Sequence, residues 1–267
     1  MPSTYAHRRF GANIADHLPK EAAKIVERNR EVYDIGLHGP DIFFYYHALK
    51  SNPVSALGNH MHEQPGAVFF EKARKCILRS KNQEAALAYV LGFICHFALD
   101  STCHPYIEQY IRDSGVSHCE IECEFDMKLM RRDGLDPYHY LTASHIKPTI
   151  ENAAVIAPFF AKDGLTLKQV HESLKQMLLL HKCLMVTSPA KHALLITAVK
   201  LSGKYEYLHG QVANLKPNPD CVQSSKQLEE LYAKALPLAE KLILEYIDAL
   251  HTDEPLNSAY QHTFGEN

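Results

Sequence analysis

The chain has no tryptophan, and only 12 glycines and 14 prolines are spread over its 267 residues. This composition excludes collagen-like and low-complexity chains. Hydrophobic residues make up 46% of the chain, which is enough to fill a core. The formal net charge of -3 provides no excess of positive charge for binding DNA or RNA. We therefore expect a globular protein with no stable nucleic-acid partner.

Signals for export, disulfide formation and membrane insertion are also missing. The seven cysteines are odd in number and include no Cys-x-x-Cys pair, which favours reduced thiols. The N-terminus has no apolar stretch behind its charges, unlike a secretory signal. The most apolar run, residues 88–99, is shorter than the roughly 20 residues of a transmembrane helix. These features predict a cytoplasmic protein with no transmembrane segment and leave its oligomeric state open.

Alternating strand patterns are absent, and apolar residues recur at helical spacing almost throughout. This pattern predicts an all-α fold in which residues 1–267 form a single-domain multi-helix bundle. Ser117, Thr166 and Ser188 are expected N-caps, and Pro105 and Pro189 suit first-turn positions. The expected helices cover residues 12–30, 41–49, 66–79, 82–101, 105–113, 117–131, 150–161, 166–185, 189–201 and 225–250, with loops at 132–148 and 203–223.

Histidine is unusually frequent, with 17 residues, of which seven lie between positions 38 and 118. Two pairs, His96/Asp100 and His118/Glu122, are spaced four residues apart, so each can chelate a metal ion from one helix face. The chain contains five pairs in which an acid follows a histidine by four residues, against roughly two expected by chance. The spacing alone is therefore a weak indication of a metal site.

The surroundings of the first pair strengthen the metal hypothesis. His96 and Asp100 interrupt an apolar helix, and His104 follows four residues later, at an expected helix break before Pro105. Buried ionisable groups cost several kcal/mol unless they are paired or bound to a metal. A buried ion pair between His96 and Asp100 is the alternative. Imidazole and carboxylate ligands together suit zinc, iron or manganese, and zinc is favoured. Cys119 and Cys123 are interpreted as packing residues.

The ordered pattern H-x-x-x-D-x-x-x-H…H-x-x-x-E, from His96 to Glu122, resembles the zinc-dependent phospholipase C family, which is related to the single-strand-specific zinc nucleases. Three upstream segments extend the resemblance: YAHRRFG, GLHGPDIFFYY and GNHMHEQPG. It covers about residues 4–130, the expected metal-site part, whereas the supporting helices at about 150–250 fit an all-α bundle less specifically. The resemblance implies a metal cluster held between helices.

The resemblance also implies a set of ligands that would bind two or three zinc ions. One zinc would be held by Asp41, His62 or His60, His96 and Asp100, and a second by His104, His118 and Glu122. His62 is preferred because it directly precedes the EQP segment. Secreted members hold a third zinc through an N-terminal tryptophan and a histidine, which His7 resembles. This chain has no tryptophan, and the amine of Pro2 is the substitute if Met1 is removed.

The implied activity is hydrolysis of a phosphoric ester by metal-activated water, with in-line attack. Asp41 would be both a metal ligand and the general base, and the substrate would be a phosphodiester small molecule or a phospholipid head group. The sequence shows no amphipathic anchor for a membrane. Alternatives are a nuclease-like phosphodiesterase acting on nucleotides and a non-catalytic helical zinc-binding or interaction protein. His145, His181 and His209 have no partner spacing and are expected to be ordinary surface or core residues.

Overall fold

A computed structural model describes residues 4–203, 205–252 and 254–265. These residues form helices joined by turns and loops, with no strand among them, which confirms the all-α prediction. The helices are α1 (Thr4–His17), α2 (Lys20–Arg28), α3 (Arg30–Gly36), η1 (Gly39–Tyr45), α4 (Pro53–Glu63), α5 (Gly66–Arg79), α6 (Gln83–Ser114), α7 (His118–Arg132), α8 (Ile150–Phe160), η2 (Ala161–Asp163), α9 (Leu167–Leu184), α10 (Pro189–Leu201), α11 (Tyr205–Leu208), η3 (His209–Gln211), η4 (Pro219–Cys221), α12 (Val222–Ala249) and η5 (Ser258–Gln261).

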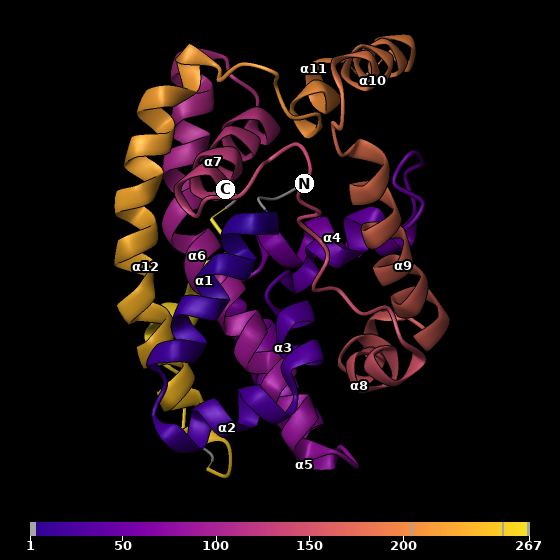
Figure 1. Cartoon of the computed structure of the whole chain (residues 1–267). Helices are drawn as coiled ribbons and strands as arrows, with labels where there is room; N and C mark the ends of the chain where they lie inside the picture. The colour runs from indigo at the N-terminus through magenta and orange to yellow at the C-terminus, as the bar shows by residue number, and fades with distance from the viewer. Residues whose placement is uncertain (1–3, 204, 253, 266–267) are drawn as a thin grey trace.

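The long helix α6 is the centre of the bundle. It packs against α1, α3, α5 and α12, and the cartoon shows α12 along one side of it (Figure 1). By length and composition α6 could cross a membrane, but 89% of its most apolar window is buried inside the protein. This burial agrees with the prediction that the apolar run belongs to a core helix.

Prolines explain most differences between the expected and the observed helices. The single helix expected over residues 12–30 is divided at Pro19, whose extended backbone separates α1 from α2. The break expected before Pro105 is wrong, because α6 continues through this residue. Cys103 and Ile107 are buried on either side of it, so their packing offsets the lost backbone hydrogen bond. The expected helix over 41–49 is a 3₁₀ helix over 39–45, and α3 and α4 were not expected.

The predicted helix starts are confirmed where side chains cap them. Ser117 accepts a hydrogen bond from the backbone N–H of Glu120, and Ser188 accepts one from that of Lys191. Thr166 forms a capping box with Gln169. These local caps fix where α7, α9 and α10 begin, so the sequence determines these boundaries.

Two glycines allow α3 and α6 to touch through their backbones. A Cβ at Gly92 would collide with the carbonyl oxygen of Tyr33, and one at Gly36 would collide with that of Tyr89. Helix η1 begins at Gly39, three residues after the end of α3. Gly39 has a φ of 47°, and a Cβ at this position would collide with the ring of His96. This close approach therefore sets η1, which carries Asp41, directly beside the histidines of α6.

We expect Gly92→Ala to destabilise the protein by about 1–3 kcal/mol, because the added methyl meets backbone atoms that cannot move aside. Chemical denaturation followed by circular dichroism would measure the free energy of unfolding. Ser101→Ala, on the same helix, is the control and should change it by less than about 0.5 kcal/mol. Equal effects of the two substitutions would contradict the assigned role of the glycine contact.

Candidate metal centre

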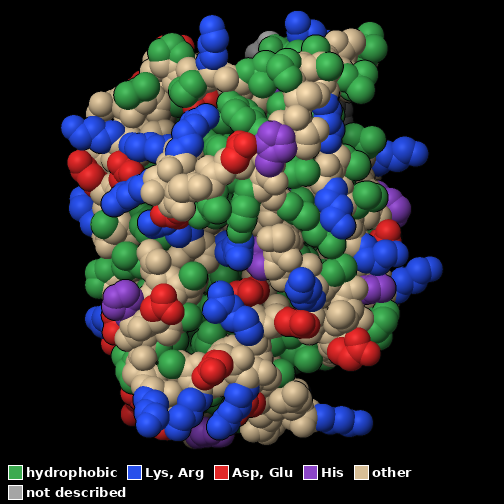
Figure 2. All heavy atoms as spheres, in the orientation of Figure 1, with side chains coloured by type: hydrophobic (Ala, Val, Ile, Leu, Met, Phe, Trp, Pro, Cys, Tyr) green, Lys and Arg blue, Asp and Glu red, His purple; other side chains and the backbone are tan. Residues whose placement is uncertain are grey.

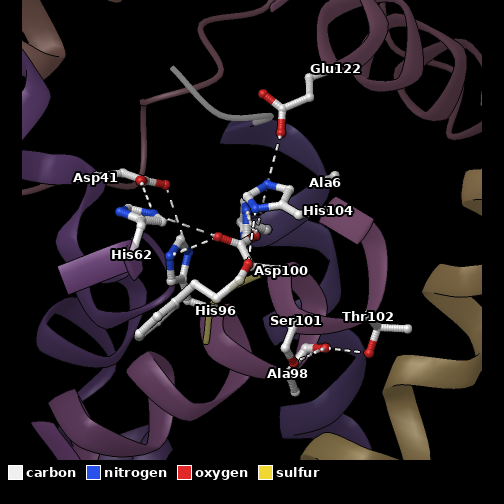
Figure 3. A network of polar contacts seen from close by, with 12 residues as sticks. Ala6, Asp41, His62, His96, Ala98, Asp100, Ser101, Thr102, His104 and Glu122 are labelled. Carbon is white, nitrogen blue, oxygen red and sulfur yellow. Dashed lines mark hydrogen bonds and ion pairs between the residues drawn. The ribbon is translucent and has the colours of Figure 1, made fainter. Parts of the chain in front are cut away.

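Five helices bring the predicted ligands together, several of which are labelled in Figure 3. Three successive turns of α6 present His96, Asp100 and His104 on one face. The first turns of α7 contribute His118 and Glu122. The remaining residues come from α1, η1 and the end of α4, namely His7, Asp41 and His62.

The first group of donors consists of His7, Asp41, His96 and Asp100, whose ligand atoms all lie within 4.8 Å of one another. Asp100 Oδ2 is 3.1 Å from His96 Nε2, and Asp100 Oδ1 is 3.1 Å from His7 Nε2. His62 approaches from the side, with its Nε2 3.1 Å from Asp41 Oδ1. All five side chains are buried, so this group could hold a metal ion out of contact with bulk water.

The second group consists of His104, His118 and Glu122, again with ligand atoms within 4.8 Å of one another. Glu122 Oε1 is 3.2 Å from His118 Nε2 and 3.5 Å from His104 Nε2. Asp100 Oδ1 lies 3.8 Å from His104 Nε2. The Asp100 carboxylate is therefore placed between the two groups and faces both.

Backbone carbonyls orient two of the histidines for metal binding. His62 Nδ1 lies 2.8 Å from the carbonyl oxygen of Gly58, and His104 Nδ1 lies 3.0 Å from that of Phe264. In the neutral tautomer that donates these bonds, Nε2 carries the free lone pair and points into the site. The N–H of Phe264 also donates to the carbonyl of His62, at 3.3 Å. A C-terminal residue thus connects the two histidines, and nothing in its local sequence indicates this role.

The carboxylates make the site favourable for positive charge. Burial alone would lower the pKa of His104, but Asp100 and Glu122 raise it to about 9. Burial lowers the pKa of His96 to about 4, so this imidazole is neutral and able to bind a metal. The nearby histidines hold the pKa values of Asp100 and Glu122 below their ordinary range, although burial opposes this shift. Both carboxylates are therefore ionised and available as ligands.

Unpartnered polar atoms support the presence of a metal. Within the part of the chain that the structure describes, six buried side-chain atoms of the centre have no partner in hydrogen-bond geometry, although two of them, His96 Nε2 and Asp100 Oδ2, are 3.1 Å apart: His7 Nδ1, Asp41 Oδ2, His96 Nδ1 and Nε2, Asp100 Oδ2 and Glu122 Oε2. Each such atom costs about 1–3 kcal/mol if it stays unpaired. Divalent ions bound to these imidazole and carboxylate donors would satisfy those that face the centre, and this mixed donor set suits zinc.

Asp126 holds α1 in place, although the sequence analysis did not identify it. Its two carboxylate oxygens accept hydrogen bonds from the backbone N–H groups of Tyr5 and Ala6, each at 2.8 Å. Burial raises the pKa of Asp126 to about 7, while these bonds favour the carboxylate. The carboxylate of Asp126, on α7, therefore caps the start of α1 at the residues that directly precede His7. It could not be recognised locally because its partners are about 120 residues away.

Two histidines interpreted as ordinary residues, the buried His145 and the half-buried His181, contact polar groups at the two ends of η1. His38 Nε2 lies 2.7 Å from His145 Nε2, so one ring donates to the other. His181 Nε2 is 2.9 Å from the hydroxyl of Tyr45, and its Nδ1 is 2.9 Å from that of Thr142. Burial lowers the pKa values of His145 and His181, to about 3 and about 4. Both therefore stay neutral at physiological pH and support the site without adding charge.

The remaining predicted residues are placed as follows. His62 faces Asp41, whereas His60 is exposed and borders a separate small cavity, so the geometry favours His62 as the ligand. Neither Cys119 nor Cys123 joins a group of metal donors among the described residues. His7 lies in the first group, beside Asp100. The Pro2 amine that the third site would need lies outside the described residues, so that part of the prediction stays untested.

A cavity of about 110 Å³ lies next to Glu122. Thr4, Asp126 and His181 give it a polar side, and methionines give it an apolar side. The methionines that line it are Met127, Met130 and Met185. Flexible methionine side chains adapt to ligands of irregular shape, so the cavity could receive an organic group attached at the metal centre.

We expect Asp126→Ala to destabilise the protein by about 2 kcal/mol or more, because two backbone N–H groups lose their acceptor. The loosened α1 should also lower zinc affinity through His7. Thermal unfolding and zinc titration would measure these effects. Asp136→Ala removes an exposed carboxylate that accepts the N–H of Tyr138, and it should alter neither property. An Asp126→Ala protein as stable as this control would disprove the capping role.

We expect the purified protein to contain about two zinc ions per chain, since the donors form two groups. His96→Ala and His118→Ala should each remove about one ion, and Asp100→Asn should weaken both sites because its carboxylate faces both. Elemental analysis after dialysis would count the ions. His60→Ala is the matched control and should retain both. Full zinc content in His118→Ala, or loss of an ion in His60→Ala, would contradict the assignment.

Comparison with curated proteins and with solved structures gave no match. A sequence model of one family does match, over residues 6–172, which include all the donor residues of the centre; its description is zinc dependent phospholipase C. The match covers more than half of the chain. The two groups of donors and this match lead to one conclusion: the chain belongs to the zinc-dependent phospholipase C family.

Proposed function

We propose that the protein is a phospholipase C-like phosphodiesterase that hydrolyses its substrate with metal-activated water. The observation that carries this proposal is the pair of donor groups on either side of Asp100. Adjacent metal sites that share a carboxylate suit phosphoryl transfer, because two charges can act on one phosphate. Family membership supports the same reaction class.

The proposed metal ligands follow the two groups. His7, Asp41, His62, His96 and Asp100 surround the first site, and His104, His118 and Glu122 surround the second. Bound zinc would supply positive charge that stabilises the phosphoryl oxygens and lowers the pKa of water toward neutrality. The protein fixes the positions of these side chains through α6, α7 and the backbone carbonyls of Gly58 and Phe264.

Asp41 is the proposed general base. Its Oδ1 faces His62, whereas its Oδ2 is buried and accepts no hydrogen bond from the described residues. Oδ2 can therefore take a proton from a nucleophilic water in the centre. Because Asp41 lies on η1 and Gly39 brings η1 against His96, the base is fixed relative to the ligands of α6.

The second group favours a catalytic site over a purely structural one. Structural zinc is usually enclosed by four protein ligands, whereas catalytic zinc keeps a position for water or substrate. This group has three protein donors, and the side chain of His118 is 26% exposed. The cavity beside Glu122 provides space for a substrate next to it. The non-catalytic alternative does not account for this open side.

The substrate class and the location in the cell remain part of the proposal. The apolar side of the cavity, with Met127, Met130 and Met185, suits the organic portion of a phosphodiester or phospholipid. No disulfide joins two cysteines among the described residues, which agrees with a reducing cytoplasm. We therefore propose a cytoplasmic enzyme acting on a phosphodiester or a phospholipid head group.

We expect Asp100→Asn to lower phosphodiesterase kcat by about 100-fold or more, because the neutral amide holds metal and activated water less well. Turnover of bis(p-nitrophenyl) phosphate and of phosphatidylcholine would be measured together with zinc content. Chelation should abolish the wild-type activity, and added zinc should restore it. Asp16→Asn, an exposed substitution on α1, is the control. Full zinc content with unimpaired turnover in Asp100→Asn would remove this residue from the site.

A further inference from the structure

Helix α10 lies apart from the rest of the bundle. The cartoon shows it at the upper right edge of the molecule, next to α11 (Figure 1). None of its 13 residues is buried, and the exposed fractions of Leu194 and Leu201 are 68% and 83%. The space-filling view shows hydrophobic side chains at the surface in this upper right region (Figure 2). The protein core therefore does not account for the apolar character of α10.

The apolar residues of α10 surround the helix instead of forming one stripe. At 100° per residue, Leu194, Leu195 and Ile196 alone point in three separate directions. A helix that is apolar on all sides normally lies in a protein core or in lipid. The absence of a stripe also explains why no amphipathic anchor is recognisable in the sequence. The apolar members are Ala190, Ala193, Leu194, Leu195, Ile196, Ala198, Val199 and Leu201.

Along the chain between Glu172 and Glu206, the charged residues around α10 have one sign. The segment 173–205 contains five lysines and no aspartate or glutamate, although the whole chain has a net charge of -3. Two of these residues, Lys191 and Lys200, lie on α10 itself. If α10 contacted α10 of a second copy, these lysines would face one another with no acid in the segment to pair with. An anionic phospholipid surface complements both the lysines and the exposed leucines.

The residues just before α10 and just after α11 both lie beside α7, the helix that carries His118 and Glu122. Met185 and Val186, just before α10, line the cavity beside Glu122. After α11, His209 Nε2 lies 2.8 Å from Glu120 Oε2 on α7, the helix that carries His118. The spacing of His209 in the sequence gives no indication of this partner, which lies 89 residues away in the chain. A surface bound by α10 would therefore lie near the side of the protein where this cavity is found.

We propose that α10 docks the protein onto an anionic phospholipid bilayer. With about 1.5 Å per residue, α10 is roughly 20 Å long, which is too short to cross a hydrocarbon core of about 30 Å. It lies in the interface, with Leu194 and Leu201 among the acyl chains and Lys191 and Lys200 at the phosphates. The use of docking for catalysis rests on the proposed function, whereas docking itself does not.

The test is sedimentation of the full chain with vesicles of phosphatidylcholine, with and without phosphatidylglycerol. We expect the wild type to sediment with the anionic vesicles, and Leu194→Gln/Leu201→Gln to weaken this binding by about ten-fold or more. Lys191→Glu/Lys200→Glu should do the same and remove the dependence on phosphatidylglycerol and on salt. The matched controls are Val68→Gln/Ile150→Gln, two exposed apolar residues on α5 and α8, and Lys20→Glu/Lys168→Glu; both should bind as the wild type does.

Wild-type protein that stays in the supernatant would overturn the proposal, and so would leucine variants that bind as tightly as the Val68→Gln/Ile150→Gln control. Light scattering that shows a dimer lost in Leu194→Gln/Leu201→Gln would assign α10 to a second copy and also overturn it. Turnover of bis(p-nitrophenyl) phosphate separates the two proposals. The α10 variants should retain this turnover, and a wild type that binds vesicles without any phosphodiesterase activity would support docking while refuting the proposed function.

Discussion

Three carboxylates buried inside a helical bundle are the constraint on which the rest of the structure depends. Asp41, Asp100 and Glu122 each have an exposed fraction below 5%, and burying such charges is costly unless positive charge or metal surrounds them. The protein meets this requirement with histidines from separate helices. Asp100 is central, since its two oxygens face donors of both groups. Its position between the groups makes the arrangement suitable for two ions acting together.

Packing elsewhere in the molecule maintains this geometry. The backbone contact between Gly36 and Gly92 brings α3 and η1 against α6, and Asp126 caps α1 beside the histidine it carries. Phe264 joins His62 and His104 through its N–H and carbonyl. Each of these contacts connects distant segments, so the metal centre depends on complete folding of the bundle and not on any single helix.

The core and the exposed helix α10 treat their side chains in opposite ways. The core around α6 buries the ionisable groups, whereas α10 leaves apolar side chains uncovered. The segment around α10, residues 173–205, contains lysines and no acidic residue. Uncovered apolar residues of this extent are costly in water unless they meet a partner. Because the residues just before α10 and just after α11 lie beside α7, an interaction at α10 is close to the cavity next to Glu122. This proximity would place a bound lipid surface near the side of the protein that holds the cavity.

The sequence by itself determined the helical class, the capped starts of α7, α9 and α10, and the donors spaced four residues apart, because these features depend on local periodicity and short-range hydrogen bonds. It also placed His96 and Asp100 within the core helix, since their apolar neighbours surround them in the chain. Only the tertiary structure decided that α6 continues through Pro105, that His62 rather than His60 faces Asp41, and that Asp126 supports α1. These outcomes result from packing between segments far apart in the chain, whose free energy outweighs local preferences and which no short stretch of sequence encodes.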